Sequence, residues 1–189
     1  VYAFCAPLVM HGIDSAFLLL IGTHSVYTAH KYITKYTYPD KENGIWYASD
    51  GTFIGDYKTV LESADDAAVA NWGGVWRMPT DEEFQELLNN CNRSWTTRNG
   101  VNGCLFASRT NGNTLFLPAA GYRLSDQNED IQGVGQRGDY WTSSLDEGLS
   151  SQALGFYFYH RPDQNDVKHG ANGSYYRCDG HSVRPVLDK

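Results

Sequence analysis

The chain has 189 residues, of which 41% are hydrophobic and 14% aromatic, and a formal net charge of −7. This length suits one domain with its own core. The negative charge, without a cluster of Lys or Arg, argues against a nucleic-acid partner. The apolar run at residues 16–22 is much shorter than the roughly 20 residues of a membrane-spanning helix. It predicts a buried strand or short helix instead.

Residues 1–45 contain no motif that fixes their fold. The four cysteines, Cys5, Cys91, Cys104 and Cys178, show no zinc-binding spacing with histidine. Free buried thiols are the favoured interpretation, and a Cys91–Cys104 disulfide in an exported protein is the alternative. We expect no cofactor and no bound metal.

Two helices are predicted in the first half of the chain. Asp65 and Asp66 precede a short Ala-rich helix at residues 67–71, which Gly73 and Gly74 end. A buried strand at residues 75–78 follows. Thr80 and Glu83 then form a capping box for a second helix that ends near Asn90. Its apolar face carries Phe84, Leu87 and Leu88, and Glu82, Glu83 and Glu86 are expected on its solvated face.

The second half of the chain is predicted to consist of strands and turns. Asn-Gly pairs at residues 99–100 and 111–112 indicate tight turns. Strands are expected at residues 115–118, 140–144, 153–159 and 182–187, and a polar loop at 125–138. Because side chains alternate along a strand, Phe156 and Phe158 should point inward while Tyr157 and Tyr159 point outward.

The order of motifs over residues 64–188 resembles one bacterial family. These motifs are DDAA, NWGGVWRMPT, NGNTLFLPAAGYR, GDYWTSS and GHSVRPV. They resemble C-type-lectin-fold modules of gut Bacteroidetes and the variable proteins of diversity-generating retroelements. The resemblance implies an α+β class with the C-type lectin fold: two helices, small twisted antiparallel sheets and long loops in a single domain over residues 1–189. Residues 1–45 lack the opening segment that the family usually has.

The same resemblance implies a non-catalytic recognition protein whose variable ligand-binding region lies at residues 138–189. Its framework positions would be Trp141, Ser143, Ser144, Ala153, Phe156, Phe158, Arg177, Gly180, Ser182, Val183, Arg184 and Pro185. The ligand-binding positions would be Asp146, Glu147, Tyr157, Tyr159, His160, Arg161, Asp163, Gln164, Asn165, Tyr175, Tyr176, Asp179 and His181. Tyr, Asn, Ser and Gly are typical of binding loops. We expect the Tyr, His and Arg members of this set, together with Asp179, to be exposed and close together on one face.

The implied partner is a protein or glycan on another cell, and the implied location is extracellular, on a bacterial surface or a phage particle. The sequence leaves the oligomeric state open, an oligomer included. One alternative is a fimbrial or surface adhesin module whose face packs against a neighbouring subunit. Another is a relative of the formylglycine-generating enzymes, which depend on reactive cysteines; only Cys178 lies near the expected face. Asp163, Asn165 and Asp166 form an oxygen-rich loop, but it lacks the fuller ligand set of a calcium site.

Overall fold

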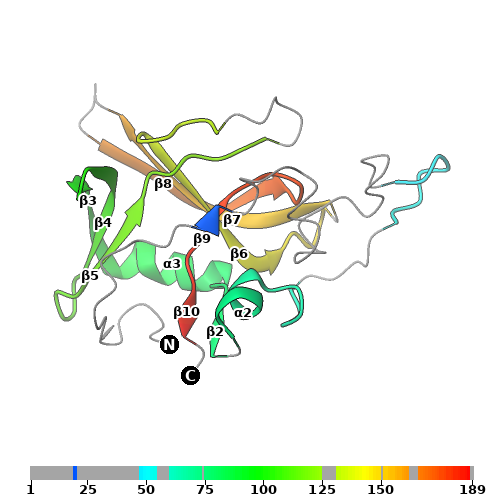
Figure 1. Cartoon of the computed structure of the whole chain (residues 1–189), viewed down its shortest axis with the longest axis horizontal. Coiled ribbons are helices and arrows are strands. Elements are labelled where there is room, and N and C mark those ends of the chain that lie inside the picture. Colours follow the sequence, from blue (N-terminus) through cyan, green and yellow to red (C-terminus); the bar gives the residue numbers. More distant parts are fainter. Residues whose placement is uncertain are drawn as a thin grey trace.

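The computed structural model describes residues 19–20, 47–54, 60–73, 75–124, 131–149, 151–161 and 166–187. Over these residues the protein is a mixed α+β structure rich in sheet, which confirms the predicted class (Figure 1). Its elements, in chain order, are β1 (Leu19–Leu20), α2 (Ala67–Trp72), β2 (Trp76–Arg77), α3 (Asp81–Asn90), β3 (Cys91–Arg98), β4 (Val101–Ser108), β5 (Thr114–Pro118), β6 (Arg137–Leu145), β7 (Gln152–Arg161), β8 (Asp166–Tyr176), β9 (Ser182–Val183) and β10 (Val186–Leu187).

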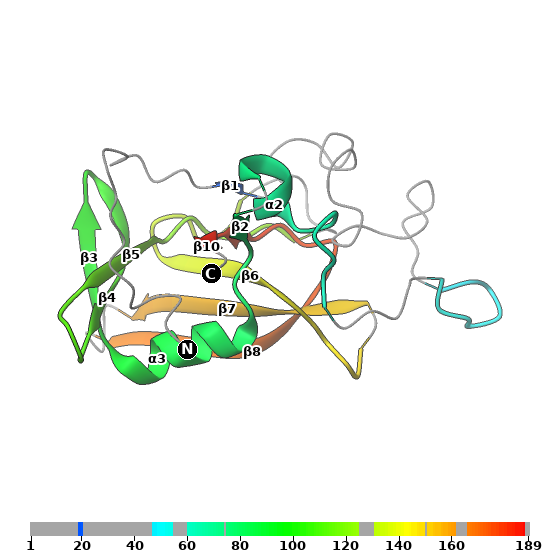
Figure 2. The same ribbon diagram turned by 90° about the horizontal axis from the view of Figure 1, so that it is seen from below.

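The strands form three sheets. The largest has the order β1-β9-β6-β7-β8, and the others are β3-β4-β5 and the pair β10-β2. Helix α3 lies along one face of the largest sheet and contacts β6, β7 and β8, while β3-β4-β5 stands at one end of the molecule (Figure 2). The face of the large sheet turned away from α3 is called here the outward face.

The large sheet separates two hydrophobic clusters because successive strand residues point to opposite sides. On the α3 side, Phe84 stacks on Phe156 with ring centroids 4.5 Å apart, and Phe106 and Phe158 complete the contact. On the other side, Trp141 is fully buried in a cluster with residues from α2 and the segment after it. The framework tryptophan and phenylalanines therefore hold the two layers together.

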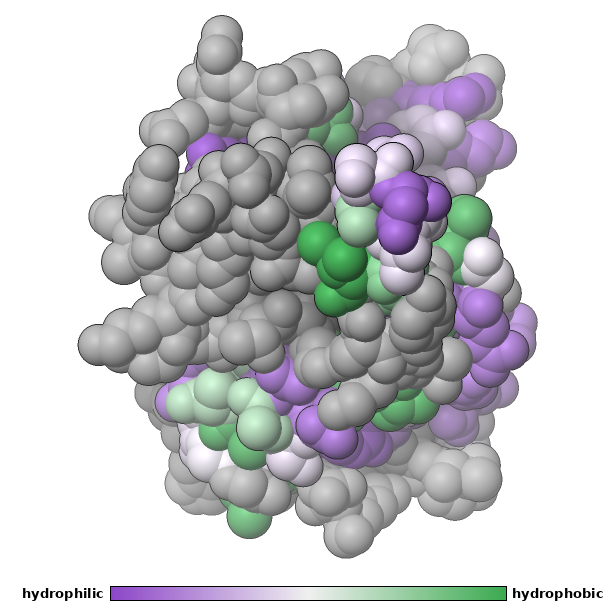
Figure 3. Space-filling view, turned by 90° about the vertical axis from the view of Figure 1, so that its right-hand side faces the viewer, coloured by the Kyte–Doolittle hydropathy of each residue, from purple (hydrophilic) through white to green (hydrophobic). Residues whose placement is uncertain are grey.

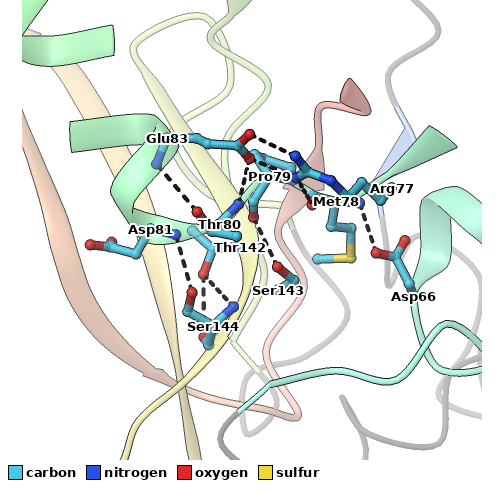
Figure 4. Close-up of polar contacts among 10 residues, drawn as sticks. All are labelled: Asp66, Arg77, Met78, Pro79, Thr80, Asp81, Glu83, Thr142, Ser143 and Ser144. Carbon is cyan, nitrogen blue, oxygen red and sulfur yellow. Dashed lines mark hydrogen bonds and ion pairs between the residues drawn. The ribbon is translucent and has the colours of Figure 1, made fainter. Parts of the chain in front are cut away.

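Both predicted helices form with the predicted caps. The Asp66 carboxylate accepts hydrogen bonds from the amides of Ala68 and Val69 at the start of α2, and Gly73 ends the helix at a φ of +92°. The second Asp66 oxygen accepts from the Met78 amide at 2.8 Å, which ties α2 to the segment after β2 (Figure 4). At α3, Thr80 and Glu83 exchange the two hydrogen bonds of a capping box.

Glu83 corrects one prediction, since it does not belong to a solvated face. Both of its carboxylate oxygens accept hydrogen bonds of 2.7 Å from Arg77, and its side chain is only 15% exposed. Burial opposes its ionisation, but the hydrogen bonds from Arg77 and the Thr80 amide and the charge of Arg77 lower the pKa of Glu83. Arg77 is therefore a structural residue that holds the start of α3.

Two motifs of the resemblance contact each other directly, as Figure 4 shows. The Ser143 amide donates to the Pro79 carbonyl at 2.8 Å, and the Asp81 amide donates to the Ser144 hydroxyl at 3.2 Å. The end of GDYWTSS is thus fastened to the turn that starts α3. This junction fixes where β6, and with it the large sheet, lies against the helix.

The turn between β3 and β4 has the predicted type. Asn99 and Gly100 have φ values of +49° and +80°, the signs that a type I′ hairpin turn requires. Cys91 and Cys104 in these strands are free and buried, which confirms the thiol interpretation over the disulfide; Cys5 lies outside the described residues.

Three strand predictions need correction or refinement. Strand β8 was not predicted, because its sequence of polar and glycine residues lacks an apolar alternation. The expected strand at residues 182–187 is divided into β9 and β10, which belong to different sheets. The loop expected at residues 125–138 ends before Arg137, because β6 begins at that residue. The apolar run 16–22 contains strand β1, which pairs with β9.

Candidate functional site: an aromatic and cationic sheet face

The strand register shows which side chains lie together on the outward face, because directly paired residues point to the same side of the sheet. Arg137 of β6 pairs with Tyr159 of β7, and Tyr159 pairs with Lys168 of β8. The next row along the strands contains Asp139, Tyr157 and Gly170. The end of the sheet thus presents a row of cation, tyrosine and cation beside a row of carboxylate, tyrosine and glycine.

Tyr157 and Tyr159 lie on this outward face, as the alternation predicted. Their neighbours Phe156 and Phe158 are fully buried on the α3 side. The two tyrosine side chains are half-buried, which corrects the expectation that they are exposed. Their rings are nearly parallel, with an interplanar angle of 15° and centroids 6.3 Å apart. Two stacked rings restrict one another, so they form a preorganised contact surface.

Two glycines of β8 make room for the tyrosine rings. A Cβ atom at Gly170 would lie 2.6 Å from the Tyr157 ring, and one at Gly173 would lie 2.7 Å from the Tyr175 ring. Separations below 3 Å would force the rings to move. The glycine content of β8, which hid this strand in the sequence, thus lets the tyrosines lie against the sheet.

The polar centre of the face is an ion pair between Arg137 and Asp139. Nε and Nη2 of Arg137 each donate to one Asp139 oxygen at 2.7 Å. The Asp139 side chain is completely buried, whereas that of Arg137 is 30% exposed. The guanidinium carbon lies 4.7 Å from the centroid of the Tyr122 ring and 5.3 Å from that of Tyr157. The cation is therefore held between a buried carboxylate and two rings.

The two members of this pair respond differently to burial. Burial raises the pKa of Asp139, and the hydrogen bonds and charge of Arg137 and a hydrogen bond from Tyr175 offset only part of this rise. For Arg137, burial alone would lower the pKa, but the hydrogen bonds and charge of Asp139 hold it above its usual value. Arg137 is thus a permanent cation on the face.

Arg161 extends the cluster beyond Tyr159. Its guanidinium carbon lies 5.5 Å from the centroid of the Tyr159 ring, and its Nη2 donates to the Tyr159 hydroxyl at 3.2 Å. Both side chains are half-buried. Arginine stacked on tyrosine is a pairing that occurs often in recognition surfaces.

Tyr175 belongs partly to the core. Its ring meets Trp141 edge-on at 6.2 Å and His181 at 4.6 Å, and it packs against the buried cluster around Trp141. Burial and the charge of Asp139 raise the pKa of Tyr175. The expectation that Tyr175 is simply exposed is therefore corrected: it joins the outward face to the core beneath it.

Three predicted positions do not lie where they were expected. Asp179 is 6% exposed and His181 is completely buried, so neither presents its side chain to a ligand. His181 stacks on Trp141 at 4.2 Å, because the short strand β9 carries this segment into the core. His160 is half-buried on the opposite face from Tyr159 and stacks on Trp95 at 5.0 Å, since alternation reverses its direction.

The remaining predicted positions lie at the rim or outside the described residues. Asp146 accepts hydrogen bonds from the amides of Gly148 and Leu149 and from the Ser174 hydroxyl, so it shapes the loop after β6. Glu147 and Tyr176 are exposed. Asp163, Gln164 and Asn165 lie outside the described residues. The structure thus brings together Tyr157, Tyr159, Arg161 and Tyr175 from the predicted set.

Sequence reasoning missed four members of the cluster: Tyr122, Arg137, Asp139 and Lys168. A signal for two of them was present. Arg137 and Asp139 are separated by one residue within RGDYW, so an early start of the strand would have put both on the face opposite Tyr140. The contribution of Tyr122 depends on a contact between distant segments.

Three other kinds of feature would point to a function among the described residues: a metal site, a reactive thiol or a membrane-spanning helix. No group of three or more His, Cys, Asp or Glu side chains among them could hold a metal ion. Burial raises the pKa of Cys104 to about 12, so this thiol stays protonated at neutral pH. None of the described helices is both long and apolar enough to cross a membrane.

Figure 3 shows one side of the molecule, on which the hydrophobic residues among the described ones form separate groups next to polar ones. Comparison with protein-family models, with curated proteins and with solved structures gave no match. The functional argument therefore rests on the outward face itself.

Proposed function

We propose that this protein is a non-catalytic recognition module with the C-type lectin fold that binds a macromolecular ligand through the outward face. The observation that carries the proposal is the pair Tyr157 and Tyr159, stacked beside Arg137 and opposite a fully buried phenylalanine layer. Tyrosine and arginine are the residues that most often dominate binding energy at interfaces. The setting is extracellular, on a bacterial surface or a phage particle.

The division between buried and outward positions supports a variable-type face like that of diversity-generating-retroelement proteins. Most framework positions are buried, while Tyr157, Tyr159 and Arg161 are backed by the sheet without forming its core. Outward side chains supported in this way can change without cost to the core. A scaffold of this kind tolerates diversification of its ligand-binding side chains.

Binding should depend on the outward tyrosines far more than folding does. We expect Tyr157→Ala and Tyr159→Ala to weaken binding by roughly 30-fold or more, the cost of losing a hot-spot residue. Each should reduce the free energy of unfolding by less than about 1 kcal/mol. The measurement is binding of the labelled full chain to a panel of bacterial cells and to a glycan array, with urea unfolding of each variant.

Tyr47→Ala is the matched control, because Tyr47 is exposed and the segment 47–54, coloured cyan, lies away from the sheets (Figures 1 and 2). Equal losses of binding in the control and in the outward variants would contradict the proposal. So would binding that survives removal of both outward tyrosines.

Diversification has a separate test in the gene itself. Sequencing the locus from many isolates should show replacements concentrated at codons 157, 159, 161 and 168, with Phe156 and Phe158 unchanged. Replacements spread evenly over both faces of the sheet, or none at all, would favour a fixed adhesin module.

A further inference from the structure

Arg137 is the most rigidly held polar group of the outward face. The ion pair with Asp139 uses its Nε and Nη2 edge, and the rings of Tyr122 and Tyr157 confine the guanidinium plane. Nη1 lies outside the ion pair, on a side chain that is 30% exposed. A group fixed in this way loses little conformational entropy when a ligand binds it.

The buried partner Asp139 explains why this arginine keeps one orientation. In this ion pair the carboxylate is fully buried and the guanidinium is partly exposed at the surface of the outward face. The planar fork of arginine makes two bonds to Asp139, and Tyr175 also hydrogen-bonds this guanidinium. Nη1 takes no part in the bonds to Asp139 and can donate to a further acceptor. Asp139 is therefore a positioning residue for Arg137.

Cations gather among the described side chains at this end of the sheet. Arg137, Arg161 and Lys168 lie on the outward face, and Asp139 is the carboxylate that holds Arg137. Cations on an otherwise acidic chain of net charge −7 favour an acidic partner at this place.

The rings also indicate the kind of partner. Tyr157 and Tyr175 lie where Cβ atoms would stand if Gly170 and Gly173 were larger residues, so the rings fill the space above the sheet. Small ligands bind in concave sites, whereas a surface of tyrosine and arginine supported by strands suits a protein partner.

We propose that the outward face binds an acidic segment of a protein, and that Nη1 of Arg137 donates to one of its carboxylates while Asp139 holds the guanidinium in place. This proposal rests on the proposed function and specifies its partner. Tyr157 and Tyr159 supply the apolar contact beside that carboxylate. The orientation of Arg137 then determines where the acidic side chain must lie.

The test uses the full chain, a hexaglutamate peptide and a hyaluronate oligosaccharide of matched charge, which carries its carboxylates on a glycan. The NMR signals of the arginine Nε–Hε groups and of the tyrosine rings are followed during titration. We expect hexaglutamate to shift the Arg137 and Tyr157 signals first. Arg137→Gln should weaken the binding by about tenfold or more, the loss of one charge-assisted contact.

Two further variants separate position from charge. Arg137→Lys keeps the positive charge but lacks the planar guanidinium. Asp139→Asn keeps the guanidinium but removes the carboxylate that accepts its two hydrogen bonds. Both variants should bind hexaglutamate more weakly than the parent chain. Arg98→Gln is the control, because Arg98 is an exposed arginine over the ring of Phe116 on the β3-β4-β5 sheet. If Asp139→Asn fails to fold, the titration of the unmodified chain still decides.

Equal shifts at Arg98 and Arg137 would show nonspecific attraction and overturn the proposal, as would preferential binding of hyaluronate or an absence of shifts at Arg137. Cell binding separates this inference from the proposed function. If Tyr157→Ala abolishes cell binding and Arg137→Gln leaves it unchanged, the recognition face stands and the acidic partner does not.

Discussion

Lowering the pH from 6.5 to 4.5 is expected to reduce the free energy of unfolding by about 2 kcal/mol through His181 alone. The His181 side chain is completely buried between Trp141 and Tyr175, and neither ring nitrogen has a hydrogen-bond partner. Burial, aided by the charge of Arg137, lowers the pKa of His181 from 6.5 to about 3. A cation here would be desolvated and unpaired.

The direction of this effect follows from proton binding. Below pH 6.5 the unfolded chain protonates His181 while the folded chain does not, so each further drop in pH favours unfolding until the folded pKa near 3 is reached. Well above pH 6.5 the residue is neutral in both states and contributes no pH dependence. The charge of Arg137 acts in the same direction as burial, because it too disfavours a cation at His181.

Urea unfolding of the parent chain and of His181→Phe between pH 4.5 and 7.5 measures the effect. Phenylalanine keeps an aromatic ring on Trp141 and carries no titrating group, so the variant should lose about 2 kcal/mol less over this range than the parent does. His160→Phe is the control, since His160 is half-buried against Trp95. Equal pH dependence in the parent chain and His181→Phe would show that His181 is solvated or paired in the folded protein.

Replacing Asp66 with alanine should cost roughly 2 to 4 kcal/mol of the free energy of unfolding. The helix cap contributes about 1 kcal/mol, and the Met78 amide, left buried without its acceptor, contributes about 1 to 3 kcal/mol. The first-turn amides of α2 and the Met78 amide depend on the same carboxylate. One of its oxygens accepts from the start of α2, and the other accepts from Met78. The loss should therefore exceed that of a surface cap.

Asp66→Asn tests which oxygen matters. The amide keeps one oxygen for the helix cap but presents an NH₂ group to the Met78 amide, so we expect a cost between those of the parent chain and Asp66→Ala. Asp50→Ala is the control, because Asp50 accepts from the Thr52 amide in an exposed turn and should leave the free energy of unfolding nearly unchanged. A cost below about 1 kcal/mol for Asp66→Ala would mean that the junction between α2 and Met78 is not a source of stability.

Some features were predictable because they depend on neighbours in the sequence. The caps at Asp66 and Thr80 use amides two or three residues away, and the turn at Asn99 needs only the local φ values. The alternation of phenylalanine and tyrosine in β7 is likewise local. These features correctly placed both helices and the outward direction of Tyr157 and Tyr159.

The candidate site was only partly predictable, because its members come from separate segments. The contact of Tyr122 with Arg137 and the neighbouring position of Lys168 depend on strand register and a distant loop. His160 was assigned to the wrong face although the alternation indicated otherwise. Composition indicates which side chains suit recognition, but it does not give their direction.

By itself, the sequence determined the α+β class, the two capped helices, the tight turns and the inward and outward sides of β7, because each follows from hydrogen bonds or periodicity within a few residues. The tertiary structure alone decided that β8 is a strand, that Glu83 binds Arg77, that His181 and Asp179 are buried, and that Arg137 is held on Asp139 between two rings. Pairing and burial depend on segments far apart in the chain, since the environment of a side chain is set by the elements packed against it.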